Sequence, residues 1–140
     1  MAGLKPRVVL DTNVIISSFW GGKPGEIVDL WKDGRILLIV SLPILKEYLA
    51  VCARFGLADA QLKERGLLFL ESPFSTLVHA RSEFSVIQED LPDNRFLECA
   101  VDGGANFIVS GDQHLLRLKV FQKIPILSPI DFLKRLSEGG

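Results

Sequence analysis

The stretch Arg7-Val8-Val9-Leu10-Asp11-Thr12-Asn13 decides the fold class of this chain. Its β-branched first half predicts a short buried strand over 7–10, which ends at an aspartate. Outward from it, apolar runs predict further strands over 36–40, 76–78, 106–109 and 123–127. We expect the last of these at the sheet edge, because Pro125 cannot donate to a ladder. Helical patterns lie between and after the strands, over 25–32, 41–54, 59–71, 93–101, 115–118 and 128–136. This alternation predicts an α/β fold with a mainly parallel sheet covered on both faces.

The composition is that of an ordinary globular protein. The chain has 140 residues, of which 48% are hydrophobic and 24% charged, and this excludes disordered, collagen-like and coiled-coil classes. The sequence shows no internal repeat or linker, so we expect a single domain over 1–140. The 16 Lys and Arg against 17 Asp and Glu give a net charge of −1. The strongly basic balance that indicates nucleic-acid binding by itself is therefore missing.

The cysteines and the lengths of the apolar runs indicate where in the cell we expect the protein. Cys52 and Cys99 lie in apolar helical patterns without the spacing of a zinc site or a disulfide framework, so we expect two buried thiols in a reducing environment. The longest run without a charged residue is the eleven residues of 12–22, and a membrane span needs roughly 18. The first seven residues do not resemble a signal peptide. We therefore expect a cytoplasmic protein that does not associate with membranes.

Acidic residues stand at the ends of two predicted strands. Asp11 follows the first strand directly, and Asp112 follows the strand over 106–109 after Ser110 and Gly111. The carboxyl ends of parallel strands meet at one edge of a sheet, where ligands bind in such folds. Either aspartate alone could be a turn or helix-capping residue. The two together favour a functional site.

Three more acids lie in predicted helices. Glu47 has apolar neighbours at helical spacing on both sides, unlike a typical surface glutamate. Asp93 opens the helix over 93–101, where an acid also suits the helix dipole. Glu98 lies about 140° round that helix from Asp93. It either leans into the same site or pairs with Arg95, three residues earlier.

Carboxylates that converge in a dry pocket need a counter-charge. Their mutual repulsion would otherwise raise their pKa values until some of them protonated. Oxygen ligands without a cysteine or histidine cluster favour a hard cation, Mg²⁺ or Mn²⁺. Such a site suits phosphodiester hydrolysis, because the ion lowers the pKa of a bound water and neutralises charge on the phosphoryl oxygens.

Other motifs give weaker support to other functions. The stretch Gly21-Gly22-Lys23-Pro24 lacks the spacing of a Walker A loop. The stretch 11–13 lacks the second aspartate of a haloacid-dehalogenase phosphoacceptor motif. His79 and His114 stand apart in the sequence without a matching partner, so we interpret both as structural or surface residues.

Four segments together resemble the PIN domain family. In chain order they are the stretch 9–17 with Asp11, Glu47 in the second long helix, the stretch 92–100 with Asp93, and the stretch 108–112 with Asp112. Their order and spacing are similar to those of small bacterial and archaeal PIN proteins, the VapC-like toxins of toxin–antitoxin systems. The resemblance covers nearly the whole chain. It implies a three-layer α/β/α sandwich with a mainly parallel central sheet, and a Mg²⁺- or Mn²⁺-dependent endoribonuclease.

The resemblance also implies residue roles. The acidic catalytic and metal-site residues would be Asp11, Glu47, Asp93 and Asp112, with Glu98 as a further candidate ligand. Asn13 would hydrogen-bond and orient Asp11, and Ser110 occupies the small hydroxyl position before Gly-Asp. His114 stands where many relatives carry another aspartate, and Asn94 stands where some have a second acid. These two departures leave open whether one or two metal ions bind.

RNA is the substrate that the resemblance implies. RNA must reach an acidic pocket, so we expect basic residues around it. The candidates that flank the motifs are Lys46, Arg54, Arg95, Arg117 and Lys119. An antitoxin partner and a homodimer are implied by the resemblance alone. Two alternatives stay open: a catalytically weak RNA- or antitoxin-binding module, and an α/β domain that acts on phosphomonoesters.

Overall fold

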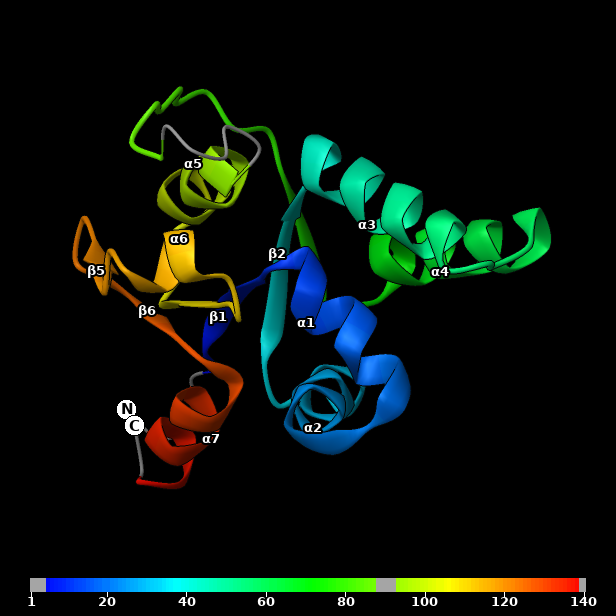
Figure 1. Cartoon of the computed structure of the whole chain (residues 1–140), viewed down its shortest axis with the longest axis horizontal. Helices are drawn as coiled ribbons and strands as arrows, with labels where there is room; N and C mark the ends of the chain where they lie inside the picture. Colours follow the sequence, from blue (N-terminus) through cyan, green and yellow to red (C-terminus); the bar gives the residue numbers. More distant parts are fainter. Residues whose placement is uncertain (1–4, 88–92, 139–140) are drawn as a thin grey trace.

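A computed structural model describes residues 5–87 and 93–138 of the chain (Figure 1). Its strands are β1 (Arg7–Leu10), β2 (Leu37–Ser41), β3 (Ser75–Val78), β4 (Phe107–Val109), β5 (Val120–Phe121) and β6 (Ile124–Leu127). Its helices are α1 (Thr12–Ser17), the 3₁₀ helix η1 (Ser18–Trp20), α2 (Gly22–Lys32), α3 (Leu42–Arg54), α4 (Asp59–Glu71), α5 (Asn94–Asp102), α6 (Gln113–Leu116) and α7 (Pro129–Ser137).

The strands form a six-stranded sheet in the order β3-β2-β1-β4-β6-β5. All neighbours are parallel except β5, which pairs antiparallel with β6. The α/β fold with a mainly parallel sheet is thereby confirmed. The predicted edge position of the last long strand is wrong, because β6 lies between β4 and β5. Its proline is tolerated there because β4 pairs with Ile126 and Leu127 beyond it, and Pro125 itself is opposite Val120 of the two-residue β5.

Helices cover both faces of the sheet, which gives the three layers that were expected. α5 packs against β1, β2 and β4, and Figure 1 shows α5 and α7 on opposite sides of β1 and β6. On the α7 face, the rings of Phe107 in β4 and Phe132 in α7 meet edge to face, 5.5 Å apart. α2 contacts α7 on that side of the molecule.

Local signals explain most of the helix boundaries. Ser41 caps α3 as predicted, since its side chain accepts a hydrogen bond from the backbone N–H of Ile44, and a proline stands in the first turn. The bounds of α4 are those predicted. Cys52 and Cys99 are buried thiols that form no disulfide, also as predicted. Within the described residues, no helix is long and apolar enough to cross a membrane.

Three short elements were not predicted: α1, η1 and β5. α1 begins directly after β1, so the chain turns from strand to helix at Asp11 without a loop. Six, three and two residues are too few to show a hydrophobic period. α1 matters most for function, because its first residues, Thr12 and Asn13, contact Glu47 and Asp11.

Candidate active site

Two aspartates emerge side by side at the carboxyl edge of the sheet. β1 and β4 are parallel neighbours with Leu10 opposite Val109, and the backbone N–H of Asp11 donates to the carbonyl of Val109 at 2.9 Å. Asp11 and Asp112 then cap α1 and α6, each accepting a hydrogen bond from the backbone two residues later. The two parallel strands therefore bring both acids to the same edge of the sheet.

Ser110 links these two aspartates. Its fully buried hydroxyl donates to Oδ2 of Asp11 at 2.5 Å and accepts from the backbone N–H of Asp112 at 2.9 Å. Burial raises the pKa of Asp11 from 3.8 to about 6, although the hydrogen bonds from Ser110 and the Asn13 backbone lower it. The charges of Asp112 and Glu47 raise it further. Ser110 therefore holds this carboxylate in place, while burial disfavours its charged form.

Glu47 reaches the site from α3. Its Oε2 accepts a hydrogen bond from the hydroxyl of Thr12, the first residue of α1. Glu47 is half-buried, and its charge acts on the pKa of Asp11. The packing of α1 on α3 therefore brings the third predicted acid to the carboxyl edge of the sheet.

Asp93 and His114 complete the group. Asp93 immediately precedes α5 and is 6% exposed. Nδ1 of His114 lies 3.8 Å from Oδ2 of Asp93 and 3.5 Å from Oδ1 of Asp112. One ligand atom from each of these three residues lies within 4.8 Å of the others, a spacing that a single cation can bridge.

His114 is the site residue that the sequence reasoning missed. Its Nδ1 is buried and makes no hydrogen bond within the described residues. Its backbone N–H donates to Oδ1 of Asp112 at 2.7 Å, which fixes its place in the first turn of α6. The available signal was its position two residues after a strand-end aspartate, where a capped turn brings the two side chains together.

Two other predicted residues have different surroundings. Glu98 is buried, and its carboxylate accepts hydrogen bonds from Arg95 at 3.0 and 3.2 Å and from the backbone N–H of Phe84 at 2.8 Å. Of its two alternatives, pairing with Arg95 is the one that the structure shows. Asn13 contacts Asp11 through its backbone N–H at 3.5 Å, while its side chain is exposed. A role for the Asn13 side chain amide stays a prediction.

The predicted basic residues are exposed on the surface. Lys46 and Arg54 are exposed on α3, and Arg117 and Lys119 are exposed at the end of α6 and after it. Arg95 is half-exposed and engaged by Glu98. Lys119 has a φ of 63°, which is unusual for a residue other than glycine.

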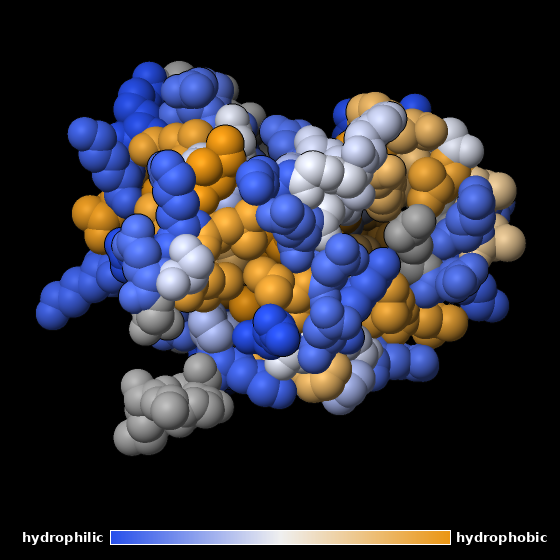
Figure 2. Space-filling view, turned by 90° about the horizontal axis from the view of Figure 1, so that it is seen from below, coloured by the Kyte–Doolittle hydropathy of each residue, from blue (hydrophilic) through white to orange (hydrophobic). Residues whose placement is uncertain are grey.

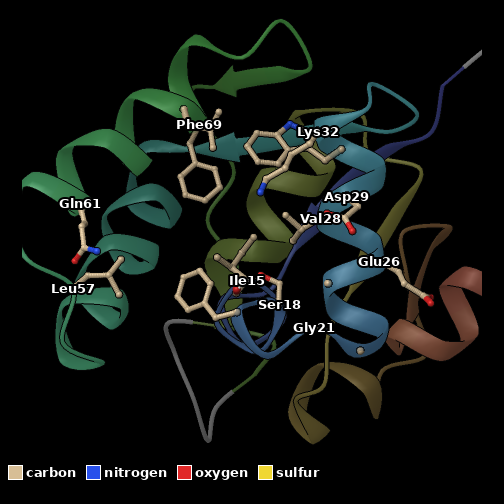
Figure 3. A pocket seen from close by; sticks show the side chains of 15 residues that line it. Ile15, Ser18, Gly21, Glu26, Val28, Asp29, Lys32, Leu57, Gln61 and Phe69 are labelled. Atoms are coloured by element: carbon tan, nitrogen blue, oxygen red, sulfur yellow. Dashed lines mark hydrogen bonds between the residues drawn. The ribbon is translucent and has the colours of Figure 1, made fainter.

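A groove of about 730 Å³ lies apart from the acids, between α2 and α4 with α1 at its floor (Figure 3). Its walls are mixed, with apolar residues such as Ile15, Leu57 and Phe69 beside Glu26 and Asp29. In Figure 2, a notch separates the part of the molecule that contains α3 and α4 from the rest, and apolar and hydrophilic residues alternate over this face. None of the four predicted acids lines this groove.

Comparison with known proteins identifies the family. A comparison with curated proteins gave no match. The family model of the PIN domain matches residues 7–114, most of the chain, from β1 through Asp11, Glu47, Asp93 and Asp112 to His114. PIN domains are in general nucleases that use divalent metal ions. With this match and the acids gathered at the sheet edge, the chain belongs to the PIN domain family.

Proposed function

We propose that the protein is a Mg²⁺- or Mn²⁺-dependent endoribonuclease that hydrolyses RNA phosphodiester bonds. The observation that carries this proposal is the linkage of the acids. Ser110 joins Asp11 to Asp112, Thr12 holds Glu47, and His114 lies between Asp93 and Asp112. Four acids drawn from distant parts of the chain thus meet at the edge where α/β folds bind ligands.

The donor set fits a divalent cation. Asp11, Asp93 and Asp112 would hold it. Burial raises the pKa of Asp11, and a bound cation would favour its charged form again. His114 adds a nitrogen donor, which transition metals such as Mn²⁺ accept more readily than Mg²⁺ does. When bound, the ion would lower the pKa of a water molecule and neutralise charge on the phosphoryl oxygens.

The chain itself orients the reacting groups. Ser110 donates to Oδ2 of Asp11 and the backbone N–H of Asn13 contacts Oδ1, which fixes the carboxylate and leaves each oxygen a lone pair for a ligand. Glu47, held by Thr12, is placed as a further ligand or to orient the attacking water. Attack by water in line with the leaving 3′-oxygen does not use the 2′-hydroxyl of RNA as the nucleophile. The products should therefore carry 5′-phosphates.

A cleavage assay with end analysis tests the proposal. Purified protein should cut RNA with Mg²⁺ or Mn²⁺, stop in EDTA, and leave 5′-phosphate ends. Asp11→Asn should abolish cleavage, whereas Asp29→Asn, which alters an exposed acid on α2, should not. Cleavage that persists in EDTA, or full activity of Asp11→Asn, would refute it. Hydrolysis of a small phosphomonoester instead of RNA would favour the phosphatase alternative, and metal binding without cleavage would favour a binding module.

The biological setting is part of this proposal. We infer a single domain over 1–140 that acts in the cytoplasm as the toxin of a toxin–antitoxin pair, bound by a cognate antitoxin and forming a homodimer. Membership of the PIN domain family supports this setting, because PIN domains often pair with antitoxins. If a small gene lies next to this one, co-expression with its product, followed by co-purification and a growth assay, tests it. A chain whose expression does not slow growth would not be a toxin.

A further inference from the structure

Two large aromatic side chains lie exposed beside each other. Trp20 ends η1 and is 70% exposed, and Phe55, the C-cap of α3, is 57% exposed. Their ring centroids are 5.8 Å apart and their planes are inclined at 70°. Each is followed by a glycine, and a Cβ atom added at Gly21 or Gly56 would meet nothing within 4 Å. Tryptophan is highly buried on average, so a pair this open, with free space next to it, has room for another planar group.

This aromatic pair lies at one end of a seam whose other end is the acidic site. Thr12 at the start of α1 contacts Glu47 of α3, and eight residues further along each segment Trp20 contacts Phe55. The two segments therefore run side by side in the same direction. A helical rise of about 1.5 Å per residue puts Phe55 about 12 Å beyond Glu47 along α3.

Two positive charges lie on the exposed side of α3, each one residue before a member of the seam. Lys46, Ala50 and Arg54 are exposed and spaced by four residues, so they share one side of α3. Lys46 adjoins Glu47 in the chain, and Arg54 adjoins Phe55. The only acid within α3 is Glu47 itself. Between the two cations, the small Ala50 leaves space for a polymer backbone to approach.

We propose that Trp20 and Phe55 form a stacking platform for an unpaired base of single-stranded RNA, whose phosphates follow Lys46 and Arg54 to the acidic site. This inference rests on the proposed nuclease function and adds to it the two residues that would bind a base next to the site. Sites for single strands combine cations that follow the backbone with aromatic rings on which bases stack. A duplex hides the faces of its bases, so this platform selects unpaired RNA.

The adjoining groove is less suited to the RNA backbone. Its labelled lining in Figure 3 includes two acids, Glu26 and Asp29, and one cation, Lys32. The acids outnumber the cation and repel phosphates. Charge complementarity therefore places the strand on the exposed side of α3 and only a base against the rings. A protein partner on the aromatic pair is the competing occupant, and the experiment below separates the two.

The tryptophan content of the chain allows a direct optical test. The chain contains two tryptophans: Trp20 is exposed, and Trp31 is 2% exposed and stacked on Phe69. We expect a twelve-nucleotide oligouridylate, added in EDTA to prevent cleavage, to quench the fluorescence of the wild-type protein. A twelve-base-pair RNA duplex should quench it far less. The Trp20→Phe variant, which retains only Trp31, should show no quenching with either RNA.

The affinity of labelled oligouridylate for variants of Trp20 and Phe55 measures how much each ring contributes to binding. Trp20→Ala and Phe55→Ala should each weaken binding by about 5- to 150-fold, the range for loss of one stacked base. Trp20→Phe should restore most of the affinity, because a ring remains. Ile130→Ala on α7 removes a comparably exposed apolar side chain and should bind as the wild type does. Circular dichroism checks that each variant is folded.

The outcomes separate this inference from the proposed function. If the wild type cuts RNA but Trp20→Ala and Phe55→Ala bind and cut equally well, the nuclease stands and the platform is refuted. If oligouridylate quenches Trp20 but no RNA is cut with Mg²⁺ or Mn²⁺, the platform stands and the nuclease fails. If the variants change the sedimentation of the protein from dimer to monomer but leave RNA binding unchanged, the pair is an interface between copies and the inference is wrong.

Discussion

Replacing Asp11 by asparagine should stabilise the metal-free protein at neutral pH while abolishing cleavage. Burial is the largest cause that raises the pKa of Asp11 from 3.8 to about 6, and the charges of Asp112 and Glu47 add to it. The native state therefore binds this proton more tightly than the unfolded chain does. Protonation of Asp11 therefore stabilises the folded wild-type protein. This contribution is fully present below pH 3.8 and is lost as the pH rises through about 6.

The magnitude follows from the two pKa values. One pH unit corresponds to about 1.4 kcal/mol, so the interval from 3.8 to about 6 is worth about 3 kcal/mol of unfolding free energy. Asparagine has nearly the same shape, carries no charge, and still offers Ser110 an acceptor oxygen. The stability of Asp11→Asn relative to the wild type should therefore rise by up to about 3 kcal/mol between pH 4 and pH 7.5.

Urea unfolding in EDTA at several pH values measures this difference. Asp29→Asn, at an exposed position, is the matched control for the loss of one carboxylate. Adding Mg²⁺ or Mn²⁺ at pH 7.5 should then stabilise the wild type more than Asp11→Asn, since the ion binds only the folded site. An Asp11→Asn difference that is the same at pH 4 and pH 7.5 would refute the reasoning.

Three further predictions concern the packing that supports the site. Gly103→Ala would place a Cβ atom 2.5 Å from Cγ2 of Ile39. We therefore expect the free energy of unfolding to fall by about 1–3 kcal/mol and the melting temperature to fall with it; an unchanged melting temperature would contradict this. Tyr48→Phe removes the buried hydroxyl that donates to the carbonyl of Leu10. It should lower the free energy of unfolding, measured in urea, by about 1–3 kcal/mol. Burial raises the pKa of Cys99 to about 12, so Cys99 of the native protein at pH 8 should resist a thiol reagent until urea unfolds the chain. Rapid labelling of Cys99, identified by peptide mass spectrometry, would show that α5 opens.

The larger elements could be predicted because their signals are local. The β-branched run over 7–10 and the capped helix after Ser41 each contain the pattern and the end signals of one element. The rule that parallel strands end at one edge placed Asp11 and Asp112 together. β6 was misplaced because the sequence of a strand does not specify its neighbours. The two-residue β5, which lies outside it, is too short to recognise.

Sequence alone determined which residues stand at the strand ends, and therefore the acids, the α/β class and the PIN family. Tertiary structure alone decided what those acids contact. Ser110 meets Asp11 across 99 residues of chain, Thr12 meets Glu47 across 35, and His114 joins the site rather than the surface. Such contacts depend on how helices pack on the sheet, and this packing follows from burial summed over the whole core rather than from any local pattern.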